Sequence, residues 1–352
     1  MTLPYEINIL NGSLGDPAIL ISVKRSGELI LFDLGDLEAA SHKELLKVRH
    51  AFVSHTHVDH FMGFDRLLRF NIPHRKKMSL YGPKGFSKNV QHKVLGYTWN
   101  LIDDDQLPFL ITELEAEGAV SYEMDKGSKF QLSEPIEANT SALATLKDGS
   151  TVVGFPLDHK GISSISYVIS SPKFNRIDQQ ALDEHNLIAG PWISEFLEDL
   201  QQENWGKEFE LNGKYSVKQL KDLIVVEGQK YSLGYITDVG FTPGNINIIS
   251  SEFPVVDCLI CETSFLDKDL DRAVSKAHLT TKQAALIAVT LGATTFQPFH
   301  VSNIYDGKVE DVLDEAQGFF EDFKSLSQKK LKELLLLELE RAIQCKSDFG
   351  EV

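Results

Sequence analysis

The segment 51–63, which reads AFVSHTHVDHFMG, gathers side chains that could bind metal ions. His55, His57, Asp59 and His60 supply four candidate ligands within six residues. The apolar residues at the start of the segment predict the end of a buried strand, and alternate side chains of an extended chain project from one side. Imidazole nitrogen and carboxylate oxygen are ligands that zinc accepts. The spacing therefore predicts a metal-binding strand-to-helix turn; a polar loop that holds histidines by chance would fit a lone histidine better than this cluster.

Three residues far along the chain could complete this site. His159 stands in a loop position shortly before a predicted strand, while Asp238 and His300 each follow one. An aspartate at the end of a strand can bridge two metals through its two oxygens. Asp238 could instead be a turn residue or a helix N-cap, since Pro243 could open a helix. Together with the histidine segment these residues would provide seven ligands, about what two zinc ions need.

Other polar residues have weaker or no ligand context. Asp33 and Asp36, in the run LFDLGD, could support the metal-binding loop through hydrogen bonds, or they could equally be N-cap or turn residues. Cys258 and Cys261 lie in an apolar strand, where we expect them to face opposite sides and not to form a zinc or redox pair. The remaining histidines are interpreted as surface or structural residues: His42, His50, His74, His92 and His185.

Length and composition are those of a globular protein with one large α/β domain or two small ones. The chain has 352 residues, of which 42% are hydrophobic. No apolar run approaches the length of a membrane span, and the N-terminus lacks the basic region of a signal peptide, so we expect a cytoplasmic protein. The three cysteines make no disulfide framework.

The net charge of −16 argues against a generic polyanion-binding surface. It does not argue against phosphoester chemistry, because bound metal ions would dominate the field of their own pocket.

The hydrophobic pattern predicts an α/β (α+β) fold in which two mixed sheets pack between outer helices. Short alternating runs over 109–146 predict a β-meander that forms the second sheet. The other strands are expected over 5–10, 18–24, 28–33, 77–81, 162–170, 231–236, 255–261 and 294–299. Helices are expected over 61–70, 86–97, 179–185, 192–202, 281–291, 311–325 and 328–344.

We interpret residues 1–352 as a single domain with an inserted arm or lid over 171–230 and C-terminal helices over 306–352. The insertion is charged, and its two helical runs flank Gly190-Pro191. An apolar stripe on the last helix is expected to pack on the core, with a homodimer contact as the alternative. The stripe consists of Leu331, Leu334, Leu335, Leu339 and Ala342.

In the order of its motifs the chain resembles ribonuclease Z, the tRNA 3′-processing endonuclease of the metallo-β-lactamase-fold hydrolases. The resemblance extends to about residue 305, through FDLGD, HTHVDHFMG, LYGPKG, a loop histidine, a Gly-Pro-containing insertion, TD, ETSF, HLT and HVS. The HxHxDH signature followed by glycine is highly specific to that superfamily. The resemblance implies a four-layer αββα metallo-β-lactamase sandwich with an inserted helical arm.

The resemblance also implies roles for individual residues. Asp59 would accept the proton of the attacking water, and His278, oriented by Glu262, would be the acid that helps the leaving oxygen. Residues 171–230 would correspond to the tRNA-binding arm, with Gly190-Pro191 at its tip. One zinc would be held by His55, His57 and His159, the other by Asp59, His60 and His300, with Asp238 bridging them.

The chain departs from the ribonuclease Z pattern at the parts that read tRNA. The family's HEAT motif reads Cys261-Glu262-Thr263-Ser264, and its HxSxRY motif reads HVSNIY, so Ile304 replaces an arginine that would contact phosphate. The N-terminal glycine loop is shortened to NGSLGDP. Part of the arm is acidic, because the single basic residue Lys207 stands in a stretch with six acidic residues. These are Glu195, Glu198, Asp199, Glu203, Glu208 and Glu210. An acidic arm should repel a phosphate backbone.

Three functions are therefore considered. The first is a dinuclear zinc phosphodiesterase of the ribonuclease Z type with precursor tRNA as its partner. The second is a hydrolase of the same fold that acts on a small-molecule ester, a cyclic nucleotide or another non-tRNA substrate. The third is a non-catalytic, metal-sensing relative, against which the completeness of the ligand set argues. Two Zn²⁺ ions are the expected cofactors, although the same ligands would accept Mn²⁺ or Fe²⁺.

Overall fold

A computed structural model describes residues 3–73 and 75–349. His74, one of the histidines interpreted as surface or structural, lies outside these residues. The chain divides into two units. The main unit consists of Met1–Ser171 and Ser232–Val352, and the arm unit consists of Pro172–Tyr231.

The first sheet of the main unit has eight strands within the described residues, in chain order. They are β1 (Tyr5–Ile9), β2 (Ile19–Val23), β3 (Glu28–Phe32), β4 (Val48–Phe52), β5 (Met78–Pro83), β6 (Phe109–Glu115), β7 (Gly118–Met124) and β8 (Ile136–Ala138). Strands β3 to β6 are parallel, and the outer pairs are antiparallel. Because the carboxyl ends of β3 and β4 meet at one edge, the segments that follow Phe32 and Phe52 leave the sheet side by side.

The second sheet has six strands in the described part of the chain, in the order β18-β17-β16-β11-β10-β9. They are β9 (Ala144–Thr145), β10 (Thr151–His159), β11 (Ile162–Ser170), β16 (Ser232–Ile236), β17 (Cys258–Glu262) and β18 (Thr295–Phe299). Strands β16, β17 and β18 are parallel. Asp238, Glu262 and His300 therefore lie at the carboxyl edge of three neighbouring strands.

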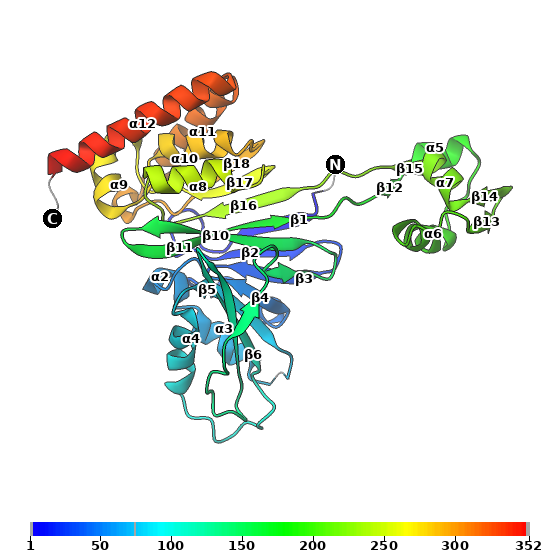
Figure 1. Cartoon of the computed structure of the whole chain (residues 1–352), viewed down its shortest axis with the longest axis horizontal. Coiled ribbons are helices and arrows are strands. Elements are labelled where there is room, and N and C mark those ends of the chain that lie inside the picture. Colours follow the sequence, from blue (N-terminus) through cyan, green and yellow to red (C-terminus); the bar gives the residue numbers. More distant parts are fainter. Residues whose placement is uncertain (1–2, 74, 350–352) are drawn as a thin grey trace. The chain divides into compact units, whose positions relative to one another are not determined.

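Helices cover the outer face of each sheet, which gives four layers in the main unit (Figure 1). The first sheet carries α1 (His42–Leu45), α2 (Val58–Phe61), α3 (Phe64–Asn71) and α4 (Phe86–Leu95). The second sheet carries α8 (Pro243–Ser251), α10 (Thr281–Thr290), α11 (Val309–Lys324) and α12 (Gln328–Phe349), and η1 (Asp267–Asp269), α9 (Leu270–Lys276) and η2 (Asn303–Tyr305) lie in its connections. The predicted four-layer αββα arrangement is confirmed.

Aromatic rings fill the space between the two sheets. Phe32 stacks on Tyr235 and Tyr167 with ring centroids 5.3 and 5.8 Å apart, and Phe52 lies edge-on to Tyr167 at 5.3 Å. The Tyr167 hydroxyl donates to the Val53 carbonyl at 2.8 Å, so the sheets are joined by a buried hydrogen bond next to the histidine segment.

The expected meander was wrong in its placement, since β6, β7 and β8 extend the first sheet and only β9 joins the second. Strand β6 pairs in parallel with β5 after the excursion through α4, and the tight β6–β7 hairpin then continues the same sheet. Alternation in the sequence reveals a half-buried strand, but it does not say which sheet the strand joins.

The apolar stripe of α12 packs on the core of the second sheet, as expected. Leu331, Leu335 and Ala342 are buried, and Leu334 and Leu339 are partly buried against the same cluster. Within the described residues, no helix is both long enough and apolar enough to cross a membrane.

The arm unit has its own small core. It contains α5 (Gln179–Glu184), α6 (Trp192–Gln201) and α7 (Val217–Ile224), with the strand pairs β12 (Arg176–Ile177)–β15 (Val225–Val226) and β13 (Glu208–Glu210)–β14 (Lys214–Ser216). Buried side chains from these elements include Leu182, Phe196, Phe209 and Leu220. Lys207 forms ion pairs with Glu195 and Asp199 at 2.6 Å each, so this lysine is neutralised within the acidic surface.

Candidate metal centre

The histidine segment forms the turn between β4 and α2, where backbone bonds fix it to the turn after β3. The Leu34 N–H donates to the His60 carbonyl at 2.9 Å, and the Gly63 N–H donates to the Leu34 carbonyl at 2.8 Å. Gly63 ends the first helical turn, so the helix expected over 61–70 is split into α2 and α3. These bonds fix the turn, while Phe61 packs in the core of the first sheet and His55 and His60 face Asp238 of the second sheet.

One cluster of ligand atoms joins this turn to the second sheet. Atoms of His55, His57, His159 and Asp238 all lie within 4.8 Å of one another. The Nε2 atoms of His55 and His159 are each 3.6 Å from Asp238 Oδ2. These side chains come from the ends of β4, β10 and β16, which shows how two sheets are needed to assemble one cluster.

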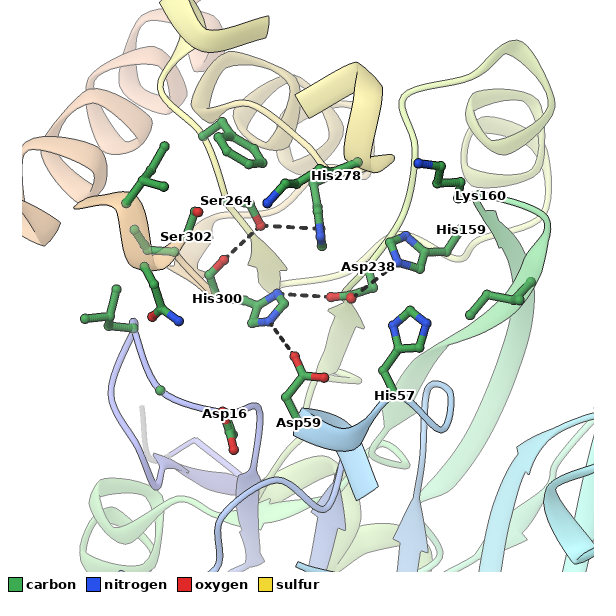
Figure 2. Close-up of a pocket in the computed structure, with 18 residues that line it drawn as sticks. Asp16, His57, Asp59, His159, Lys160, Asp238, Ser264, His278, His300 and Ser302 are labelled. Carbon is green, nitrogen blue, oxygen red and sulfur yellow. Dashed lines mark hydrogen bonds and ion pairs between the residues drawn. The ribbon is translucent and has the colours of Figure 1, made fainter. Parts of the chain in front are cut away.

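A second cluster lies on the other side of Asp238 and contains Asp59, His60 and His300. Asp238 Oδ1 is 3.4 Å from His60 Nε2 and 3.0 Å from His300 Nδ1. Asp59 Oδ2 is 3.5 Å from His60 Nε2 and 3.6 Å from His300 Nε2. Asp238 thus presents one carboxylate oxygen to each cluster, and Figure 2 shows it between His159 and His300.

The donor atoms fit two divalent cations. Within the described residues, His55 Nε2 and His60 Nε2 are buried and have no hydrogen-bond partner, which is costly unless a ligand satisfies them. Both nitrogens face the carboxylates described above at distances longer than a hydrogen bond. Imidazole and carboxylate donors in two adjacent sets, joined by one bridging carboxylate, are the chemistry of a dinuclear site.

Asp33 orients His60 from behind. Its Oδ2 lies 2.8 Å from His60 Nδ1 and accepts from the Tyr235 hydroxyl at 2.6 Å, while its Oδ1 accepts from the Ser54 N–H at 2.6 Å. A carboxylate on Nδ1 leaves Nε2 for a metal ion. Asp36 differs, because its carboxylate is exposed and accepts the Glu38 N–H, as the side chain of a turn residue does.

Two further imidazoles have a hydrogen-bonding partner at Nδ1. His159 Nδ1 lies 3.0 Å from the Ala277 carbonyl, and His55 Nδ1 lies 3.0 Å from Ser54 Oγ. The nitrogen that faces the cluster is Nε2 in both residues.

Glu262 and His278 form a pair beside the two clusters. His278 Nδ1 lies 2.7 Å from Glu262 Oε2, and the fully buried Glu262 also accepts from the Val239 N–H at 2.7 Å. The Ser264 hydroxyl donates to Glu262 Oε2 at 2.7 Å and lies 2.9 Å from the His300 carbonyl. Ser264 thus links His278 to the strand end that carries His300.

Mutual charges set the protonation of these groups. Burial and the neighbouring His60 lower the pKa of His55 to about 2. Burial alone would lower the pKa of His300, but the Asp238 carboxylate outweighs it and raises that pKa to about 10. Burial would raise the pKa of Asp59, but the hydrogen bond with His300 and the charge of His60 lower it to about 2. Burial would also lower the pKa of His278, which the Glu262 carboxylate raises instead.

The site opens into a cavity of about 620 Å³. One wall carries Leu14 and Asp16, another carries Val301 to Ile304, and a third carries Lys160 and Lys276. Figure 2 shows His57, Asp59, Asp238, His278 and His300 arranged around this space.

Sequence reasoning missed several supporting residues. Tyr235 and Ser54 bond Asp33, Ser264 bonds Glu262, and Lys160 lies in the pocket wall. Their neighbours in the sequence carry no pattern that pairs them with a partner on another strand. The position of Lys160 directly after a candidate ligand, His159, was the one available signal.

Fold and site together are those of a metallo-β-lactamase-fold protein with a candidate metal centre. No protein-family model matches the chain. Among solved structures, the short form of human tRNase Z has a TM-score of 0.50 and 17% identity, over 85% of this chain and 93% of that one. A metallo-β-lactamase fold protein of Bacillus subtilis, YhfI, has a TM-score of 0.50 and 14% identity, over 91% of this chain and 94% of that one.

The sequence comparisons point more specifically to ribonuclease Z. The ribonuclease Z of Deinococcus radiodurans is 26% identical over 298 residues, which cover 83% of this chain and 88% of that protein. The ribonuclease Z of Methanococcus maripaludis strain C5 is 27% identical over 296 residues, which cover 81% of each chain. The chain is thus similar to ribonuclease Z over more than four fifths of its length, as the order of its motifs predicted.

Proposed function

We propose that the protein is a dinuclear zinc phosphodiesterase that cleaves precursor tRNA at its 3′ end, in the cytoplasm. The observation that carries this proposal is the convergence of two ligand clusters on the two oxygens of Asp238. The likeness to ribonuclease Z sequences supports the choice of substrate.

The proposed ligands are His55, His57 and His159 for one ion and Asp59, His60 and His300 for the other, with Asp238 shared. Zinc suits these donors, and Mn²⁺ or Fe²⁺ would be accepted by the same set. Such ions would supply Lewis-acid stabilisation of the attacked phosphoryl group and lower the pKa of a water molecule.

The protein's own groups would move the protons. Asp59, whose pKa is lowered to about 2, is ionised and can accept the proton of the attacking water. His278, whose pKa is raised by Glu262, carries a proton that it can donate to the leaving 3′ oxygen. Glu262 and Ser264 hold His278 so that Nε2 is the nitrogen available to substrate.

The replacement His278→Ala tests whether His278 donates a proton and does not bind metal. We expect turnover to fall by roughly 10²–10⁴-fold, the contribution of a general acid, while metal content is unchanged. His159→Ala should instead remove metal. Loss of metal from the His278→Ala protein would assign His278 to the ligand set and contradict its role as acid.

The substrate is tested by cleavage of precursor tRNA with the purified, metal-loaded protein at low and moderate salt. A cut at the discriminator end supports the proposal. A second candidate, hydrolysis of a small ester or cyclic nucleotide, is favoured by Ile304 in the pocket wall and by the acidic arm unit. Turnover of a cyclic nucleotide, lactone or thioester without tRNA cleavage would select this second candidate.

A further inference from the structure

Helix α9 and the η1 turn before it carry a row of basic residues. Lys268, Arg272 and Lys276 recur every four residues and are exposed. Arg272 and Lys276 are four apart within α9 and so are neighbours on one side of the helix, with a rise of about 6 Å between them, while Lys268 precedes the helix in η1. The opposite side of α9, with Leu270 and Ala273, is buried. The basic side is therefore held outward.

The row ends in the wall of the pocket. Lys276 lines the cavity together with Lys160 from the β10–β11 turn. Lys160 Nζ donates to the Ser275 carbonyl at 3.0 Å, and His159 Nδ1 lies 3.0 Å from the Ala277 carbonyl. These two bonds fix the turn against the C-terminal end of α9, where cations are favoured. Figure 2 shows Lys160 beside His159 on the same side of the pocket as His278.

The four basic residues are available to a ligand. Within residues 3–73 and 75–349, the ion pairs include none with Lys160, Lys268, Arg272 or Lys276. The nearby carboxylates of Asp267 and Asp269 are engaged by Arg341 and by the Tyr305 hydroxyl. Asp271 is an exposed acidic residue on the same helix, but the exposed basic residues Lys268, Arg272 and Lys276 outnumber it.

The other pocket walls offer no comparable attraction for an anion. Lys160 and Lys276 are the lysine or arginine residues among the described residues that line the cavity. Asp16 gives one part of the wall a negative charge, and the segment from Val301 to Ile304 is uncharged. A substrate with phosphates beyond the scissile one would therefore enter along α9.

We propose that Lys268, Arg272, Lys276 and Lys160 form a phosphate-binding track that leads a single-stranded nucleic acid segment to the metal centre. The inference rests on the proposed function, because the track serves phosphates that flank the scissile bond. The rise between successive basic residues is comparable with the spacing of phosphates along an extended strand. The net charge of −16 does not oppose the track, because charges farther away than about 8 Å are screened at physiological salt.

The track is tested by binding a short fluorescent phosphorothioate oligonucleotide, which keeps the charges and resists hydrolysis, to the full-length, metal-loaded protein. The double variant Lys268→Ala/Arg272→Ala lies outside the pocket. We expect it to bind roughly five- to tenfold more weakly at low salt and to reduce the slope of log K against log salt by about 1.4, or 0.7 for each lost contact. Its kcat/KM for bis(p-nitrophenyl) phosphate, which has no flanking phosphate, should be unchanged.

A matched control removes the same charge elsewhere. Lys329→Ala/Lys330→Ala, on the exposed side of α12, should keep the wild-type salt slope. Equal slopes for the wild type and the α9 variant, or an equal loss in the control, would overturn the track. If the wild type hydrolyses bis(p-nitrophenyl) phosphate, such a result contradicts the track alone. If it hydrolyses no phosphodiester but shows the expected slopes, the proposed function fails and the track stands.

Discussion

Gly63 is the residue that allows the turn after β3 and the histidine segment to interlock. A Cβ atom at this position would lie 2.0 Å from the Gly35 carbonyl oxygen and 2.8 Å from the Leu37 side chain. The Gly63 N–H also bonds the Leu34 carbonyl, so the backbone cannot move aside without breaking that bond. The glycine behind the HxHxDH motif is thus required by close packing of two backbone segments.

The first prediction concerns this contact. Gly63→Ala should lower the free energy of unfolding by about 3 kcal/mol, the upper part of the usual range for overpacking. Chemical denaturation measures the change. Gly318→Ala in α11 is the control, because its Cβ would meet nothing within 4 Å and the change should be neutral or slightly stabilising. Equal stability of the two variants would contradict the proposed packing role.

The second prediction concerns the support of His60. Asp33→Asn keeps the size of the side chain but removes the charge that faces His60 Nδ1. We expect metal affinity at the cluster with Asp59 and His300 to fall by about 10- to 100-fold, as for other lost supporting carboxylates. Metal analysis during chelator competition measures it. Asp36→Asn should bind metal like the wild type, and an equal effect of both changes would refute the assignment.

At the residue scale, the sequence identified the side chains that converge but not those that hold them. The pattern HTHVDH has a spacing that is informative by itself, whereas Asp33 and Asp36 look alike within LFDLGD. Only the fold separates them, because Asp33 is buried beside Tyr235 while Asp36 faces solvent. Partners that meet across strands leave no local trace in the sequence.

At the scale of elements, most strand positions were predictable, but the assignment of strands to a sheet was not. The exceptions include β10, because His159, which was expected in a loop, is the last residue of this strand. Strand β18 was expected over 294–299 and is found over Thr295–Phe299. The run from β6 to β8 was expected in the second sheet but extends the first. Pairing depends on long-range contacts between strands, and these are absent from a local pattern.

The arm unit gives the third prediction. The chain leaves the main unit after β11 and returns to it at β16. These two strands pair with each other, and Ser170 lies opposite Ser232. Replacing residues 172–231 by a short glycine-serine turn should therefore close a hairpin and leave the main unit folded. We expect a cooperative thermal transition, full metal content and retained hydrolysis of bis(p-nitrophenyl) phosphate. An aggregated or metal-free product would show that the main unit depends on the arm unit.

At the scale of the whole molecule, the candidate centre draws ligands from both sheets. His55 and His60 follow β4 of the first sheet, and His159, Asp238 and His300 lie at strand ends of the second. Bound ions would therefore tie the two halves of the sandwich together. Asp238 and His300 also have positive φ angles of 46° and 54°, a conformation that non-glycine residues rarely adopt.

The fourth prediction follows from this arrangement. Removal of metal with a chelator should lower the melting temperature, because ions that bind only the folded state stabilise it by mass action, about 2.7 kcal/mol at a concentration 100 times the Kd. Calorimetry of chelated and reloaded protein measures the difference. Reloading should restore the original transition. The variant His159→Ala should respond less to chelation, and an unchanged melting temperature after verified metal removal would contradict a structural contribution of the ions.

The order of the ligands along the chain has a consequence for synthesis. His300 follows β18, the last strand in the second sheet, and it contributes to the cluster that contains Asp59. A nascent chain on the ribosome cannot complete this cluster until β18 has emerged and docked beside β17. An unfinished copy that ends before β18 would therefore lack one of the candidate ligands and hold an incomplete cluster.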